Sequence, residues 1–291
     1  MSGLAKGTPA PSNEEVLPRR TGLGRRVLRV DPSQEYLLYV PSTRSPAPPL
    51  VVSVHGMSRN VDVHARLFSA CSELYGAVLV VPHFSVTEHP DYQRLGRTGL
   101  GKRADLALNQ IVAEVAAVTG ASAERFYLFG FSGGAQFAHR YVMAHPHRIE
   151  SAVIASAGWY TFPDPARRFP NGIRPSAKLP GVRFDAEEFL RVPMKVIVGA
   201  NDDESTGLRR EVRLDREQGS TRVERARNWV AAMQAAARAH HLEPAISYEE
   251  LVDSDHSFRR SMRRGGLGDK VFEAMLGPPS SESRANLKTR P

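Results

Sequence analysis

Residues 126–139 read FYLFGFSGGAQFAH, and this stretch decides the fold. Its first half is an apolar run typical of a buried strand, and its second half has the pattern of a helix. A chain that passes so quickly from strand to helix needs a tight bend, and Gly130 and Gly134 remove side chains that would clash there. Ser132 then lies at the bend with its hydroxyl exposed above the sheet. Because the N–H of Gly133 points to where an oxyanion would form, the pattern predicts a serine nucleophile.

A serine hydroxyl is a poor nucleophile without a base, and the base needs a third group to orient it. Both appear downstream. Residues 194–205 read MKVIVGANDDES, a strand that ends in the carboxylates Asp202, Asp203 and Glu204. The late segment LVDSDHSF places His256 in a polar loop after the last apolar strand. The order serine, acid, histidine predicts that His256 is the base and that one of these carboxylates orients it.

Outside this bend, extended and helical patterns alternate along the chain. Extended segments are expected at 25–30, 35–41, 49–56, 77–84, 125–132, 151–159, 194–202 and 246–253, and helices at 64–76, 104–120, 135–146 and 224–241. Most extended segments are apolar throughout, which is typical of parallel strands covered on both faces. The first two read as an antiparallel hairpin with a turn at 31–34. The predicted fold class is α/β, with a mostly parallel, doubly wound sheet.

One continuous domain is expected over residues 21–277. The tails 1–20 and 278–291 combine proline, serine and charge with little to bury, which predicts disorder. Residues 163–190 are rich in proline and lie where a short crossover would suffice, which predicts a lid insertion. The first part of this insertion carries Arg167, Arg168, Arg174, Lys178 and Arg183 against Asp164. These charges suggest that a basic flap favours substrates with carboxylate or oligomeric ester character.

The GFSGG bend, the Gly-Ala-Asn-Asp turn and the late DSDHSF segment together resemble the α/β-hydrolase superfamily over roughly residues 21–277. The segments GWYTFPDP, RFPNG and SVHG are more loosely similar to the esterases grouped with poly(3-hydroxybutyrate) depolymerases. The resemblance implies that the acid lies three residues after the glycine that ends its strand. That residue is Asp202, after Gly199, and Asp203 is the alternative.

The same resemblance implies a second oxyanion donor in the loop after an earlier strand. In the segment VVSVHGMS, the N–H of Met57 would face the site together with that of Gly133. Gly56 is expected to border the substrate, with a plain turn as the alternative. Trp159 and Tyr160 follow a strand at its carboxyl end, the edge where ligands bind in open α/β sheets. They are expected either to form a wall of the substrate site or to pack under the insertion.

Charge and composition argue against other classes of protein. The net charge is +8, but residues 1–30 hold six basic residues against two acidic ones, and the residues from 278 onward hold three against one. The body is therefore nearly balanced, which argues against a nucleic-acid partner. No segment reads as a signal peptide or a membrane span, so a cytoplasmic protein is expected. The single cysteine, Cys71, has no internal partner, and no metal site or cofactor is expected.

Three functions compete at this point. The leading hypothesis is a serine carboxylester hydrolase that acts through an acyl-enzyme on small-molecule or oligomeric esters, with hydroxyacid esters among the candidates. A serine amidase or peptidase is the alternative, because the same residues would serve it if the amine leaving group were better protonated. A binding protein on a hydrolase scaffold is disfavoured because every position of the triad is filled.

Overall fold

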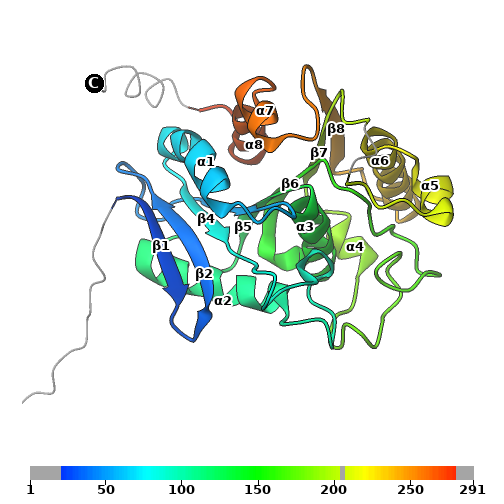
Figure 1. Ribbon diagram of the computed structural model, residues 1–291, viewed down its shortest axis with the longest axis horizontal. Helices are drawn as coiled ribbons and strands as arrows, with labels where there is room; N and C mark the ends of the chain where they lie inside the picture. Colours follow the sequence, from blue (N-terminus) through cyan, green and yellow to red (C-terminus); the bar gives the residue numbers. More distant parts are fainter. Residues whose placement is uncertain (1–20, 204–206, 280–291) are drawn as a thin grey trace, which may run out of the picture.

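The computed structural model describes residues 21–203 and 207–279, and within those ranges it contains one sheet of eight strands (Figure 1). The strands are β1 (Gly22–Leu28), β2 (Asp31–Val40), β3 (Leu50–Val54), β4 (Val78–Pro82), β5 (Phe126–Phe131), β6 (Ile149–Ala155), β7 (Met194–Gly199) and β8 (Ile246–Leu251). Their order across the sheet is β1-β2-β4-β3-β5-β6-β7-β8. β1 pairs with β2, and β2 with β4, in antiparallel fashion, whereas the other neighbours are parallel. The predicted α/β class is confirmed.

Helices cover both faces of the sheet (Figure 1). One face is covered by α2 (Ala104–Thr119), α3 (Gly133–Ala144), α4 (Ala186–Phe189) and α6 (Arg222–Ala239), and the other by α1 (Val61–Tyr75), α7 (Phe258–Arg263) and α8 (Leu267–Leu276). The short helix α5 (Val212–Gln218) precedes α6, and the 3-10 turns η1 (Tyr92–Arg94) and η2 (Pro146–Arg148) lie in loops.

The central strands are apolar on both sides because each of them supplies side chains to two separate cores. In β3, Val52 enters the core under α2 and α3, whereas its neighbour Val51 enters the core under α1 and α8. Val80 and Leu79 divide in the same way in β4. Since successive side chains of a strand point to opposite faces, a sheet covered on both sides needs unbroken apolar runs. This packing accounts for the pattern from which the fold class was predicted.

The N-terminal hairpin differs from the prediction in the position of its turn. The turn lies at residues 29–30, and residues 31–34, which were expected to form it, begin β2 instead. The side chain of Gln34 is buried, and its amide nitrogen donates hydrogen bonds to the carbonyl oxygens of Glu35 and His83. The polar residues of this segment are therefore held as a strand by contacts with the loop after β4.

The insertion at 163–190 adds no strand to the sheet. Most of its large apolar side chains are buried, among them Phe169, Ile173 and Leu179. The N–H of Thr98 donates a 2.7 Å hydrogen bond to the carbonyl oxygen of Lys178, which ties the insertion to the loop before α2. The predicted N-terminal tail and all but two residues of the C-terminal one lie outside the described residues, so the domain limits stay predictions.

Candidate active site

The bend between β5 and α3 consists of Ser132 alone. Its φ of 55° and ψ of −112° lie outside the regions that residues with side chains normally occupy. The flanking glycines are sterically required: a Cβ on Gly130 would lie 2.2 Å from the carbonyl oxygen of Gly134, and one on Gly134 would lie 2.0 Å from that of Val54. The end of β3 and the start of α3 therefore meet at the bend in a space that admits no side chain.

Three side chains from distant parts of the chain meet at this bend. The Oγ of Ser132 lies 2.9 Å from Nε2 of His256, and Nδ1 of His256 lies 2.9 Å from Oδ2 of Asp202. Asp202 follows β7 and His256 follows β8, so both come from the carboxyl edge of the sheet. With its N–H on Nδ1 donated to the carboxylate, the imidazole presents an unprotonated Nε2 to the hydroxyl. The arrangement can take the proton of Ser132 and return it to a leaving group.

The two candidate acids occupy different environments. Asp202 is fully buried, whereas Asp203 is exposed. The Oδ1 of Asp202 accepts a 3.1 Å hydrogen bond from Nη1 of Arg222, whose side chain is only 2% exposed. Each carboxylate oxygen of Asp202 thus has a donor of its own. These two bonds hold the carboxylate in one orientation, directed at the histidine.

The loop after β3 is fixed by His55. The N–H of Phe84 donates to Nε2 of His55 at 3.1 Å, so the ring carries its proton on Nδ1 and donates it to the carbonyl oxygen of Gly56 at 2.9 Å. Burial lowers the pKa of His55 to about 3, which keeps the imidazole neutral. The hydroxyl of Tyr92 donates to the carbonyl oxygen of His55 at 3.0 Å. The loop is therefore held by buried hydrogen bonds on both sides.

The two predicted oxyanion donors are adjacent. A Cβ on Gly133 would lie 3.2 Å from the Cγ and Sδ of Met57, and a Cβ on Gly56 would lie 3.4 Å from the Cβ of Ser132. Within the described part of the chain, neither the Met57 nor the Gly133 backbone N–H donates a hydrogen bond. Two uncommitted N–H groups beside a serine hydroxyl are what the stabilisation of an oxyanion requires.

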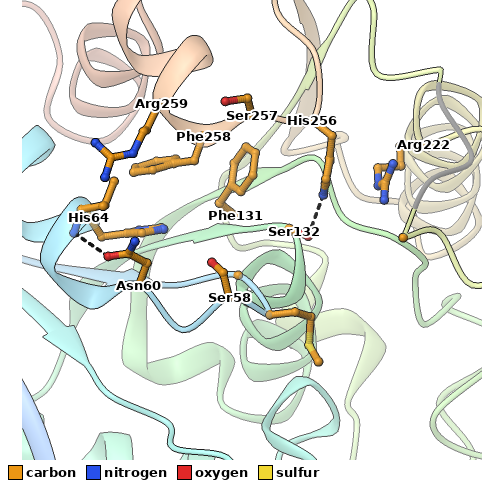
Figure 2. A pocket seen from close by; sticks show the side chains of 14 residues that line it. Ser58, Asn60, His64, Phe131, Ser132, Arg222, His256, Ser257, Phe258 and Arg259 are labelled. Carbon is orange, nitrogen blue, oxygen red and sulfur yellow. Dashed lines mark hydrogen bonds between the residues drawn. The ribbon is translucent and has the colours of Figure 1, made fainter.

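A cavity of about 380 Å³ opens beside Ser132 (Figure 2). Its lining residues come from the loop after β3, the start of α1, the end of β5, the loop after β7, the start of α6 and the segment from His256 into α7; they are Gly56, Met57, Ser58, Asn60, Val63, His64, Phe131, Ser132, Gly207, Arg222, His256, Ser257, Phe258 and Arg259. The ring of Phe131 lies 5.5 Å from that of His256, and the ring of Phe258 stacks on His64 at 3.9 Å. The cavity therefore combines an apolar middle with a polar end that holds Ser132 and His256.

Solved structures match this architecture over nearly the whole chain. Poly(aspartic acid) hydrolase-1 from Sphingomonas sp. KT-1 matches with a TM-score of 0.75 and 23% identity over 87% of this chain and 100% of that one. LpqC, a poly(3-hydroxybutyrate) depolymerase from Bordetella parapertussis, matches with a TM-score of 0.72 and 25% identity over 92% and 94%. An S-formylglutathione hydrolase from Agrobacterium tumefaciens matches with a TM-score of 0.55 and 17% identity over 83% and 90%. The chain has the α/β-hydrolase fold.

The resemblance seen in the sequence is thereby confirmed, including the similarity to a poly(3-hydroxybutyrate) depolymerase. No protein-family model matches the chain, and no curated protein matches it.

Trp159 and Tyr160, expected near the substrate, do not line the cavity beside Ser132. Trp159 is 3% exposed, and the guanidinium of Arg140 lies 4.2 Å from its ring centroid. Tyr160 is fully buried and stacks on Trp229 with ring centroids 4.7 Å apart. These contacts give both residues a packing role, but with α3 and α6 rather than under the insertion as the alternative had it, and a role in substrate binding stays a prediction.

The basic insertion also does not line this cavity. Arg167 is paired with Asp164 and with Glu217, so part of the positive charge counted in the sequence is neutralised by neighbours. The hypothesis of a basic flap over the substrate gains no support from these contacts.

Sequence reasoning indicated only Gly56, Met57, Ser132 and His256 among the residues that line the cavity, and the residues it missed include Arg222, His64 and Phe258. Arg222 is the first residue of α6, where an arginine reads as an ordinary solvated charge. His64 lies on the buried face of α1 and contacts Ser53, with Nδ1 and Oγ 2.9 Å apart. A histidine among apolar residues at helical spacing is the one signal that could have indicated it. Phe258 directly follows the HS pair of the predicted base loop and gives no signal of its own.

Within residues 21–203 and 207–279, no group of three or more histidine, cysteine, aspartate or glutamate side chains could hold a metal ion. No helix in the same ranges has the length and apolar character needed to cross a membrane.

Proposed function

We propose that the protein is a serine hydrolase that cleaves carboxylic esters through an acyl-enzyme. In this proposal Ser132 is the nucleophile, His256 the general base and acid, and Asp202 the group that orients the imidazole. The observation that carries the proposal is the continuous hydrogen-bonded chain from Ser132 through His256 to Asp202 at a strained turn. The likeness to LpqC supports an ester as the substrate.

The reaction follows from this geometry. Nε2 of His256 takes the proton of the Ser132 hydroxyl while its oxygen attacks the ester carbonyl carbon. The negative charge that develops on the carbonyl oxygen is stabilised by the N–H groups of Met57 and Gly133. The protonated imidazole then gives its proton to the departing alcohol. Water, deprotonated by the same nitrogen, releases the acid and restores the serine.

Substitution of the serine tests the proposal. We expect Ser132→Ala to keep the fold, because the smaller side chain fits the same bend, and to lose both p-nitrophenyl acetate hydrolysis and labelling by a fluorophosphonate probe. Ser69→Ala is the matched control, because Ser69 lies on α1, away from the cavity, and its hydroxyl donates to the carbonyl oxygen of Ala65. Labelling of Ser132→Ala at the wild-type level would contradict the assignment, and absence of labelling in the wild type would favour a binding protein.

The amidase or peptidase alternative uses the same catalytic residues. Substrates that differ only in the leaving group, an alcohol or an amine, distinguish it from ester hydrolysis. We expect p-nitrophenyl esters to be cleaved much faster than p-nitroanilides with the same acyl group, because an amine leaves only after protonation. Comparable rates on the two series would favour the amidase.

A further inference from the structure

The cavity beside Ser132 has two chemically different ends. Ser132, His256 and Arg222 form the catalytic end, and Asn60, His64 and Arg259 lie on the opposite side in the view of Figure 2. Phe131 and Phe258 lie between them in that view. The apolar surface in the middle therefore separates the reacting hydroxyl from a second polar region. We call Ser58, Asn60 and Arg259 the distal wall, of which Ser58 lies nearest to Ser132 in that view.

Positive charge in the cavity is concentrated on Arg259. Arg222 is engaged by Asp202 at 3.1 Å, and burial lowers the pKa of His64 well below its usual value, so His64 is neutral. Arg259 is exposed to the cavity and forms no ion pair with any described residue. Its neighbour Arg260, which does not line the cavity, is paired with Asp255 at 2.7 Å. No acidic residue is among the described residues that line the cavity.

The other two residues of the distal wall also present donors. The Oδ1 of Asn60 accepts the N–H of Val63 at the start of α1, which directs the amide NH₂ away from the helix. Neither this NH₂ nor the hydroxyl of Ser58 donates to a described residue. Both side chains are exposed. The distal wall thus offers a guanidinium, an amide NH₂ and a hydroxyl, and no carboxylate among the described lining residues competes for them.

We propose that the distal wall binds a carboxylate of the substrate, so that the preferred esters are anionic, with a hydrocarbon spacer between the ester and the carboxylate. The inference rests on the proposed ester hydrolysis and names its substrate class. A planar guanidinium donates two parallel hydrogen bonds to a carboxylate, which gives orientation as well as attraction. The spacer would lie along Phe131 and Phe258. A cavity whose unpaired charge has one sign also concentrates anions near the serine.

The carboxylate can belong to the acyl part or to the alcohol part of the ester, and two substrate series distinguish these. The first series contains monomethyl esters of linear dicarboxylic acids from succinate to suberate, with methyl esters of the matching monocarboxylic acids as neutral controls. The second contains O-acetyl derivatives of ω-hydroxy acids, with alkyl acetates as controls. Each is measured with wild type, Arg259→Gln, Arg259→Lys and Arg260→Gln.

We expect Arg259→Gln to lower kcat/KM for the anionic members of one series by about ten-fold, and to change the neutral members by less than about two-fold. Arg259→Lys should recover part of the preference for anionic esters, because lysine keeps the positive charge but cannot donate the two parallel hydrogen bonds of a guanidinium. Arg260→Gln should leave both series unchanged. Equal loss on anionic and neutral esters, or no loss on either, would overturn the inference while ester hydrolysis itself still stands.

A binding measurement separates the subsite from the catalytic proposal. Adipate, titrated calorimetrically into wild type and Ser132→Ala, should bind to both with similar affinity, and Arg259→Gln should abolish the binding. If no ester of any kind is hydrolysed, the proposed function fails and this titration alone decides the subsite. Binding that is absent from the wild type, or that Arg259→Gln leaves intact, would refute it.

Discussion

At the residue scale, the orientation of Asp202 distinguishes it from its neighbour. Asp202 and Asp203 are adjacent and chemically identical, and the resemblance to other hydrolases ranks one above the other without a physical reason. In the structure, Asp202 is buried with one oxygen on His256 and the other on Arg222, whereas Asp203 faces solvent. Burial with two donors is what an orienting carboxylate needs.

This difference predicts the effect of removing either charge. We expect Asp202→Asn to lower kcat for esters by about 1,000-fold or more, because an amide NH₂ facing Nδ1 favours the wrong tautomer of His256. Asp203→Asn should stay within about two-fold of the wild type, because an exposed side chain away from the imidazole contributes little. Initial rates on p-nitrophenyl acetate measure both. A large loss in Asp203→Asn together with a small one in Asp202→Asn would reverse the assignment.

At the element scale, the junction of β5 with α3 depends on close backbone contact. The carbonyl oxygen of Gly134 occupies the place where a Cβ of Gly130 would be, and backbone atoms cannot move aside as the end of a flexible side chain can. The sequence predicted this junction correctly because the requirement is local: strand pattern, glycine, serine, glycine and helix pattern follow one another within a few residues. Contacts between segments that lie far apart in the sequence, such as the one between Arg222 and Asp202, have no local pattern from which they could be predicted.

A single methyl group tests the junction. We expect Gly130→Ala to destabilise the protein by more than about 3 kcal/mol, or to prevent folding, because the added carbon overlaps backbone atoms. Gly24→Ala is the matched control, since Gly24 lies in β1 and a Cβ there would meet nothing within 4 Å. Chemical denaturation gives both values. Equal stability of the two variants would show that the junction relaxes more easily than its geometry indicates.

At the scale of the whole molecule, most of the sheet could be predicted and much of the cavity could not. Each unbroken apolar run reflects the burial of one strand on both faces. The positions of these strands could therefore be read from the sequence one strand at a time. The partners of Arg222 and the isolation of Arg259 depend on which loops meet at the sheet edge, and nothing next to these arginines in the sequence separates them from surface charges. The same holds for Trp159, whose position after a strand suited either a wall of the site or a packed interior.

Four buried histidines make the stability of the whole molecule depend on pH. Burial lowers the pKa of His55 to about 3, that of His89 to about 4, and those of His64 and His139 well below the usual value. In His55 and His139 the Nε2 already accepts a backbone N–H, from Phe84 and from Thr161, so protonation there would break a bond. The unfolded chain takes up protons below its ordinary histidine pKa, and the folded chain does not. Stability is therefore present above that pKa and lost as the pH falls below it.

We expect the free energy of unfolding to fall by about 1 kcal/mol for each of these histidines between about pH 7 and about pH 5.5. Urea denaturation at several pH values measures the slope. His139→Gln should be less stable at neutral pH but should lose less on acidification, because it has one fewer buried imidazole. Identical slopes in the two proteins would contradict this account. Carboxylates with lowered pKa, such as Asp31 at about 2, act in a more acidic range.

The bond between Arg222 and Asp202 joins the catalytic end of the cavity to the first turn of α6. Arg222 directly follows Thr221, whose hydroxyl accepts the N–H of Glu224 while the Glu224 carboxylate accepts the N–H of Thr221. The residues that begin α6 therefore have two tasks, because they both stabilise the end of the helix and position the side chain that holds Asp202. We therefore expect a substitution at Thr221 to slow ester hydrolysis through Arg222, although Thr221 itself does not line the cavity.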